Sequence, residues 1–415
     1  MRTDILECAG SAGVRTGIGV RHVIVLMLVV TAFGDVPAMV SIGRVSGMGV
    51  LTVVQVAMTV LALAACGTYP RRLVYVLLPY GGFLLWAAVG ALWAPNTIAG
   101  LQNLAVYVLF GLIVLLCGAL AARTPSLTDR AIESGIRWID GVTLTLVALC
   151  LVFQGLPHGQ TTWILGARSL GLLGLPLLSW HVAQAHAGSR RSMVFAWLWL
   201  MAIGLSLSRM ATAIGLLYMV IALLLQFRRS ARTFVSRAPA IAVATAIVLL
   251  VLAYETPIAD RMFTGDTSLE IAGIAVNASG RSRIWAEVAD SAMKAPIVGQ
   301  GVGSSIDAAS RIAGIGHPHN DYLRVWHDHG FIGLGLFGLA FVAMFGVMLR
   351  NLQRSERRRD PIAPTHLAGL LALTGLLIAC TTDNAIIYPF VMTPVAVLVG
   401  AGLGARGYGS APARL

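Results

Sequence analysis

Long apolar stretches recur along almost the whole chain and are separated by short polar connections. About 20 helical residues are needed to cross the hydrocarbon core of a membrane, so stretches of this length with few charges predict membrane-spanning helices. The pattern predicts an all-α polytopic membrane protein with about 12 transmembrane helices. The predicted spans are residues 22–40, 47–67, 73–93, 99–121, 136–155, 168–187, 193–208, 211–227, 238–254, 330–350, 365–381 and 386–405.

One long interval interrupts this alternation. Residues 255–329 are polar and mixed, and connections of this length are uncommon unless they serve a function. Within the interval, apolar residues have helical spacing over Ser282–Pro296 and Asn320–His329, and Gly299–Ser304 is a glycine-rich turn. We therefore expect short amphipathic helices here, lying along the membrane face. The chain divides into nine spans over 1–254, the loop over 255–329, and three spans with a short tail over 330–415.

The distribution of charge predicts the orientation of the spans. The chain has 415 residues, of which 57% are hydrophobic and 12% charged, and its formal net charge is +12. Its mean hydropathy is +0.80. Most basic residues fall in the two tails and in alternate connections, which the positive-inside rule places in the cytoplasm. The excess charge is therefore a topology signal, with cytoplasmic termini and the long loop outside, and nucleic-acid binding is not expected. Examples are Arg71, Arg72, Arg190, Arg191, Arg228, Arg229 and Arg357 to Arg359.

Several kinds of chemistry have no motif in this sequence. The five cysteines are scattered and form no CxxC pair, so neither a disulfide framework nor a zinc ribbon is indicated. The outer loops contain no DxD pair for holding a divalent metal on a diphosphate. A Walker A loop and a GxSxG elbow are also absent. ATP-driven work and serine-hydrolase chemistry are therefore not expected, and no cofactor is predicted.

A histidine-rich stretch closes the long loop. The segment HPHNDYLRVWHDHG carries His317, His319, His327 and His329, from a total of nine histidines. Three interpretations stay open from residue types alone. The segment can be an interfacial helix with its His and Trp side chains at headgroup level. A neutral imidazole can act as a general base near pH 7, and the imidazoles with a nearby carboxylate can bind a metal.

Arginines mark two further places. In SLSRMA, Arg209 lies between two apolar runs at the expected outer membrane edge, where it can snorkel to the headgroups or bind an anion. A guanidinium suits phosphate because it offers planar bidentate donors and keeps its charge. In SGRSRIW, Arg281 and Arg283 begin a predicted helix, where free backbone amides also favour anions. The alternative is that these two are solvated loop arginines.

Together these segments resemble the O-antigen ligase and polymerase superfamily of bacterial envelope glycosyltransferases. The resemblance rests on Ser208–Arg209, then Gly280–Arg281 with Ile284–Trp285, then Pro296–Gly303, then His319–Leu323, and Gly330–Gly333 opening the next span. Each motif is loose, but their order and topology are specific. The resemblance implies a GT-C-like enzyme of the bacterial inner membrane with a periplasmic active site.

The activity implied by the resemblance is that of an O-antigen ligase. It would move a glycan from an undecaprenyl-diphosphate-linked O-antigen donor to a hydroxyl of lipid A-core, without a metal. The resemblance makes His319 the general base, and gives Arg209 and Arg281 the task of stabilising the diphosphate. Possible supporting residues are Asn320, Asp328, His317, Arg283 and Tyr322. Asp328 replaces the glutamate usual in the family, and His327 and His329 lie outside the core pattern.

Alternative functions remain open. An O-antigen polymerase of the same superfamily would use the same motifs to extend the glycan on its lipid carrier. The related protein O-glycosyltransferases tend to carry a further C-terminal domain, and this sequence stops soon after its last predicted span, which argues against that activity. One extended loop late in the chain, close to His319–Leu323, favours the ligase over the polymerase. A transporter of lipid-linked glycans or solutes is a different class. Against it, polar residues such as Arg209, His319 and Asp383 gather towards the outer face, and no inverted repeat is visible.

Overall fold

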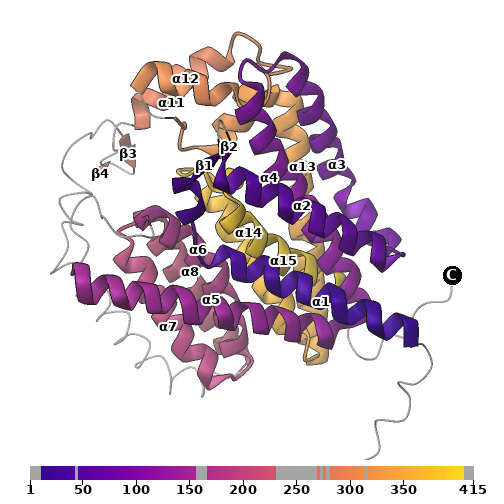
Figure 1. The fold of residues 1–415 in the computed structure, drawn as a ribbon. Helices are drawn as coiled ribbons and strands as arrows, with labels where there is room; N and C mark the ends of the chain where they lie inside the picture. The colour runs from indigo at the N-terminus through magenta and orange to yellow at the C-terminus, as the bar shows by residue number, and fades with distance from the viewer. Residues whose placement is uncertain are drawn as a thin grey trace, which may run out of the picture.

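The structure is a computed structural model, and it describes residues 11–42, 45–155, 166–229, 269–271, 274–276, 281–313 and 316–405. Within these residues the fold is a bundle of helices with two short antiparallel hairpins (Figure 1). The hairpins pair β1 (Ser41–Ile42) with β2 (Val45–Ser46), and β3 (Leu269–Ile271) with β4 (Ile274–Val276). The second hairpin falls in the long loop, where only helices were expected. The helices are α1 (Ser11–Thr31), α2 (Gly47–Cys66), α3 (Arg71–Gly90), α4 (Thr97–Arg123), α5 (Pro125–Gln154), α6 (Ala167–His186), α7 (Arg190–Leu205), α8 (Arg209–Arg229), α11 (Arg281–Ala292), α12 (Ser304–Ala313), α13 (Asp321–Arg358), α14 (Ala363–Ala379) and α15 (Pro389–Gly404).

The helices follow the apolar periodicity of the sequence. Every predicted span within the described residues overlaps one of these helices, whereas the predicted span at 238–254 lies outside them. By length and composition, five helices in the described part can cross a membrane: Gly47–Cys66, Arg71–Trp93, Thr97–Arg123, Pro125–Gln154 and Asp321–Arg358. Shorter apolar helices occupy Arg21–Thr31, Arg209–Leu225, Ala363–Ala379 and Pro389–Gly404. The chain is an integral membrane protein, and the number of twelve spans remains a prediction.

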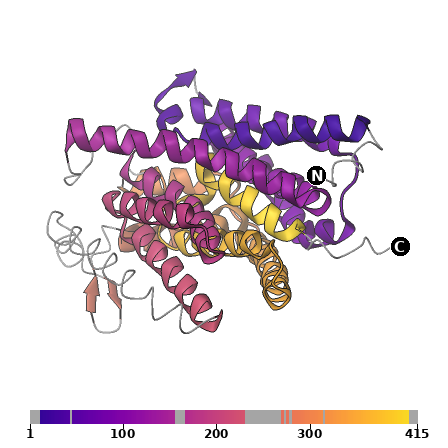
Figure 2. The same cartoon turned by 90° about the horizontal axis from the view of Figure 1, so that it is seen from below.

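Helix α15 forms the centre of the bundle. All of its residues are buried, and the view in Figure 2 shows it enclosed by other helices. Small residues permit its close approach to α4, because a Cβ at Gly400 would lie 2.6 Å from the carbonyl oxygen of Val114. Small residues at a contact let two membrane helices pack by van der Waals forces, which replace the hydrophobic effect in lipid. This close packing places α15 directly against α4.

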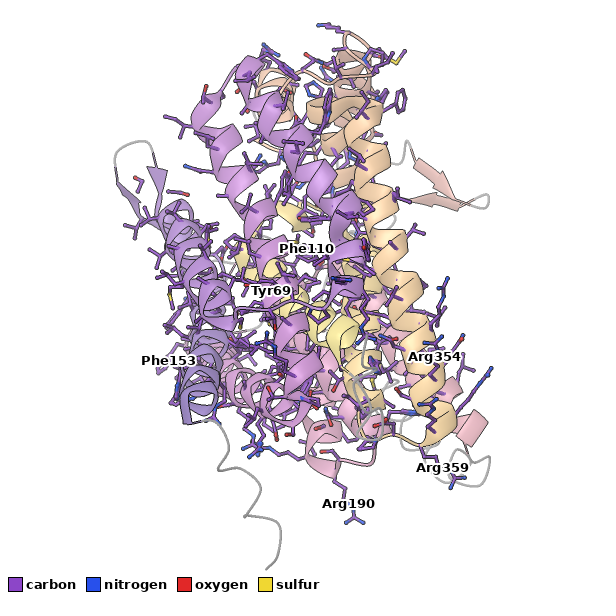
Figure 3. All side chains as sticks on the ribbon, turned by 90° about the vertical axis from the view of Figure 1, so that its right-hand side faces the viewer. Tyr69, Phe110, Phe153, Arg190, Arg354 and Arg359 are labelled. Atoms are coloured by element: carbon purple, nitrogen blue, oxygen red, sulfur yellow. The ribbon has the colours of Figure 1, made fainter. Side chains whose placement is uncertain are left out.

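Helix α13 is divided into two segments at Gly330, whose φ of 65° and ψ of −170° are not helical. The first segment contains His327 and His329, whereas His317 and His319 precede it, and the second segment contains the predicted tenth span. Figure 3 places Arg190 and Arg359 at the lower end of the molecule, whereas α11 and α12 lie at the opposite end (Figure 1). The loop helices and these basic residues are therefore well separated. The predicted orientation in the membrane requires such a separation.

Candidate active site

Helix α11 holds the segment that precedes His319. It corresponds to the amphipathic helix predicted at Ser282–Pro296, and Ile284 and Val288, one turn apart, are buried against α12 and α13. The indole Nε1 of Trp285 donates a hydrogen bond of 2.9 Å to the carbonyl oxygen of Pro318. In the Ile-Trp motif, Ile284 thus packs in the core, and Trp285 holds Pro318, the residue next to His319, by a hydrogen bond.

His319 itself has an unusual backbone conformation. Its φ is 53°, in the left-handed region that only a few non-glycine residues adopt. Such a conformation costs about 1–2 kcal/mol. It persists here because Asn320 follows as the N-cap of α13, with its side-chain oxygen accepting from the Leu323 amide at 3.0 Å. Strained residues concentrate at functional sites, where the surrounding structure over-determines them. His319 and Asn320 therefore shape the backbone at the start of α13, in addition to supplying polar side chains.

Asn384 fixes the orientation of the His319 ring. Its Oδ1 accepts from the backbone amide of His319 at 3.0 Å and from Nη2 of Arg324 at 2.9 Å, so this atom must be the oxygen. Its Nδ2 then lies 2.6 Å from Nδ1 of His319. An amide nitrogen only donates, so Nδ1 accepts. A neutral His319 in this arrangement carries its proton on Nε2.

A buried ion pair supports Asn384. Arg324 and Asp321 are both fully buried, with Nε and Oδ1 3.1 Å apart. The other oxygen of Asp321 accepts from the amide of Ile386 at 3.0 Å, and Nη2 of Arg324 also lies 3.3 Å from Nδ1 of His317. Buried charges are retained where they are paired and further hydrogen-bonded, as here. The pair ties α13 to the segment that follows α14.

The loop Cys380–Asn384 joins His319 to Arg281. Arg281 is the first residue of α11, and its Nη1 donates to the carbonyl oxygen of Thr382 at 2.7 Å. Asp383, the next residue, places its Oδ1 4.0 Å from Nδ1 of His319. A guanidinium, a carboxylate and an imidazole therefore converge on one loop. Arg283 does not join them, because its side chain is 79% exposed and pairs with Glu287 on the outer side of α11.

The Ser-Arg motif forms the turn from α7 to α8. Leu207 has a φ of 54°, and the Ser208 hydroxyl accepts from the Ala211 amide at 3.4 Å, which makes Ser208 the cap of α8. Arg209 is thus the first helical residue, and it is partly buried.

The packing of α8 against α14 shows how far along the bundle Arg209 lies. Ile214, five residues along α8, packs against Gly375 of α14, and α14 begins near Arg359, at the same end as the start of α7 (Figure 3). The helices α8 and α14 are therefore antiparallel. With about 1.5 Å of rise per residue, Arg209 and Cys380 lie at the same level. The structure brings Arg209 to the end of the bundle where the loop Cys380–Asn384 lies.

The glycine motif packs against the break in α13. Gly299, Gly301 and Gly303 all have positive φ, and the amides of Gln300 and Gly301 donate to the carbonyl oxygens of His327 and Asp328 at 2.9 and 3.0 Å. These glycines thus allow a close backbone contact that side chains would block.

Asp328 holds the start of α12. Its fully buried carboxylate accepts from the amides of Gly303 at 2.9 Å and Ser305 at 2.7 Å, and from the Ser304 hydroxyl at 3.1 Å. Acceptors at a helix N-terminus satisfy its free amides, and negative charge there is stabilising. The sequence left the role of Asp328 open, and these contacts show that its carboxylate caps the N-terminus of α12.

The remaining candidate residues belong to the framework. His327 bonds the hydroxyls of Ser304 and Ser291 at 3.0 and 3.1 Å. The His329 ring packs edge-on against Phe83, with centroids 5.5 Å apart, and Tyr322 donates to the carbonyl oxygen of Leu377 at 2.8 Å. Among the residues described by the structure, no group of three or more His, Cys, Asp or Glu side chains is arranged to hold a metal.

Two residues of this site, Asn384 and Arg324, carried no signal in the sequence. Asp321 was noted there only as a helix start signal and as a carboxylate near the histidines, and Asp383 only for lying near the outer side. Their roles depend on tertiary contacts that link positions 65 residues apart. The sequence offered one hint of this site, the polar residues Thr381 to Asn384 between the last two predicted spans.

One comparison with known proteins finds a family that is similar to part of this chain. A family model described as O-antigen ligase matches residues 194–338. The matched segment contains the Ser-Arg turn, α11, the glycine motif and the histidine-rich stretch, so it confirms the resemblance to the O-antigen ligase superfamily. A search of curated proteins gives no match to the chain.

Proposed function

We propose that this protein is an O-antigen ligase acting on the periplasmic face of the inner membrane. Its donor would be an O-antigen glycan on undecaprenyl diphosphate, and its acceptor a hydroxyl of lipid A-core. The observation that supports this most is the loop Cys380–Asn384, which contacts Arg281 on one side and His319 on the other. A site with a cation next to an imidazole suits the transfer of a group away from a diphosphate.

The arginines would act on the leaving group. In the transfer, the bond between the anomeric carbon of the glycan and the diphosphate oxygen breaks, and the electron pair stays with the diphosphate. Arg281 and Arg209 would stabilise the negative charge that develops there. Guanidinium groups keep their charge and bind phosphate oxygens bidentately, so they can replace the metal that other glycosyltransferases use.

His319 would take the proton of the acceptor hydroxyl as this oxygen bonds to the anomeric carbon. To accept at Nε2, the imidazole must hold its other proton on Nδ1. Asn384 cannot accept that proton through its amide nitrogen, but Asp383, 4.0 Å away, can after a small ring rotation. An ion pair at this distance stabilises the imidazolium by about 4 kcal/mol at an effective dielectric constant of 20. We therefore assign Asp383 the task of stabilising the protonated base.

A polymerase is the second candidate, because the same superfamily includes it and the proposed chemistry is identical. The two differ only in the acceptor, which would be a second lipid-linked glycan. No contact of the described residues distinguishes these acceptors, so the distinction rests on the product of the reaction.

The test uses purified protein in proteoliposomes with undecaprenyl-diphosphate-linked O-antigen and rough lipopolysaccharide. Gel and mass analysis would show where the glycan is attached. Glycan on lipid A-core, formed in EDTA and lost in His319→Ala, is the expected result. Longer glycan on undecaprenyl diphosphate would identify a polymerase. Unchanged turnover in His319→Ala would exclude the base, and movement of the donor across the membrane without transfer would favour a transporter.

A further inference from the structure

A polar cavity of about 230 Å³ lies between helices α5, α6, α7 and α14. It is lined by the N-terminal parts of α5, α7 and α14 and by the C-terminal half of α6. Its lining residues Arg191 and Pro361 adjoin Arg190 and Arg359, which Figure 3 places at the lower end, away from α11 and α12. The cavity is therefore remote from the proposed active site, and nothing in the transfer reaction uses it.

The acidic side chains of the cavity already have partners. The Asp129 carboxylate accepts from the Thr365 hydroxyl at 3.0 Å, and Glu133 forms an ion pair with Arg137 one turn along α5. Asp140 accepts from the indole of Trp199 at 2.8 Å and from Nε2 of His181 at 3.1 Å. Each of the three carboxylates therefore already accepts at least one hydrogen bond.

His181 has one nitrogen that the described residues leave without a partner. Its side chain is only 7% exposed, and its Nε2 must donate because the Asp140 carboxylate only accepts. Its Nδ1 is buried and has no hydrogen-bond partner among the described residues. Ionisable side chains between membrane helices are costly, and they commonly mark a ligand or ion site. A ligand oxygen bonded to Nδ1 would satisfy this group.

Arg191 and His181 both line the cavity and share the Phe195 ring as a neighbour. Its guanidinium lies 5.5 Å from the centre of the Phe195 ring, and that ring stacks on His181 with centroids 5.2 Å apart. No carboxylate of the described residues forms a salt bridge with Arg191. Arg130, also in the lining, donates to the carbonyl oxygen of Ser126 at 3.3 Å and keeps further donors. Two guanidinium groups and an imidazole thus line the same cavity.

We propose that this cavity binds a phosphate group, from either a phospholipid headgroup or a soluble phosphate. Arg130 and Arg191 would contact its oxygens, and His181 would donate through Nδ1 while Asp140 balances the charge of the ring. Exposed apolar residues on two of the lining helices, Trp138 on α5 and Val194 on α7, fit a lipid with its chains along the bundle. This site is independent of the proposed glycan transfer.

The test measures binding to the purified, delipidated full chain. The probes are inorganic phosphate, followed by calorimetry, and dihexanoyl phosphatidylglycerol, followed by native mass spectrometry. Dihexanoylglycerol, which lacks the phosphate, is the control for the acyl chains. The variants are Arg191→Gln and His181→Gln. Arg190→Gln is the matched control. It removes the same charge from the neighbouring residue, whose side chain is not part of the cavity lining.

We expect Arg191→Gln and His181→Gln to weaken binding roughly tenfold, as for the loss of one hydrogen bond to a charged group. Arg190→Gln should bind as the wild type does. Binding of phosphatidylglycerol alone would identify a headgroup site, and binding of inorganic phosphate as well would identify a soluble ligand. Equal losses in Arg190→Gln and Arg191→Gln, or no binding of either phosphate probe, would overturn the proposal. Arg191→Gln decides the outcome if His181→Gln fails to fold.

Discussion

The side-chain amide of Asn384 donates to Nδ1 of His319 across 2.6 Å, although the two residues are 65 positions apart. The contact is unambiguous in its direction, since two other donors occupy the amide oxygen. In this arrangement the neutral ring carries its proton on Nε2, so in the proposed mechanism the ring turns towards Asp383 before Nε2 can accept. It also makes Asn384 the most informative position for substitution.

Asn384→Asp should retain most of the transfer rate. The carboxylate can accept from Arg324, from the His319 amide and from a proton on Nδ1, which leaves Nε2 ready to accept the hydroxyl proton. Asn384→Leu removes all three contacts and should reduce the rate roughly 100-fold or more, the usual range for a misplaced general base. Initial rates in proteoliposomes measure both. An inactive but folded Asn384→Asp protein would indicate that His319 acts as a donor from Nε2 and not as a base.

Arg281→Gln should slow transfer roughly 10- to 100-fold, because it removes a charged hydrogen-bond donor from the diphosphate. Arg283→Gln is the matched control, since Arg283 lies two residues away and pairs with Glu287 in solvent. Its rate should be that of the wild type. The comparison measures initial rates at saturating acceptor, and equal effects of the two substitutions would contradict a specific role for Arg281.

Gly330→Ala should destabilise the protein by about 2–4 kcal/mol, through overpacking and strain. A Cβ there would overlap the carbonyl oxygen of Ile297, and the φ of 65° is unfavourable for alanine. Gly335→Ala, in the second segment of α13, meets no atom within 4 Å and should be neutral or slightly stabilising. Thermal unfolding in detergent compares them. A wild-type Tm for Gly330→Ala would show that the break in α13 is not fixed by this contact.

Asp328→Ala should lower stability by about 2–4 kcal/mol, because three buried donors at the start of α12 lose their acceptor. Asp290→Ala, at an exposed position of α11, should have no effect. Thermal unfolding without substrates is the deciding measurement, since a helix cap acts in the absence of ligand. An unchanged Tm together with lost activity would instead assign Asp328 to the chemistry.

The helices and the order of the motifs could be predicted from sequence because both depend on local patterns. Apolar runs of spanning length gave the helices, and the amphipathic spacing of Ile284 and Val288 gave α11. The Asn320 cap was also visible as a start signal. The hairpin of β3 and β4 was missed, since two strands of three residues are too short to show an alternating pattern.

The partners of His319 could not be predicted, because no local pattern reports which segments meet. Asp321 and Arg324 have the i,i+3 spacing of a solvated pair, yet both are fully buried by the segment after α14. His327 and Asp328 looked like part of a titratable cluster, but they bond the glycine turn and the start of α12. Which of several neighbouring polar residues faces a substrate is decided by packing.

The central position of α15 has a consequence for biosynthesis. This wholly buried helix comes after the helices that surround it in the order of the chain. Those helices are therefore synthesised, and enter the membrane, before α15 is made. The loop Cys380–Asn384 arrives with the same final hairpin. A ribosome that stops before α14 therefore releases a chain with His319 and Arg281 but without Asn384. Under the proposed mechanism, transfer activity should therefore appear only after synthesis of this last hairpin.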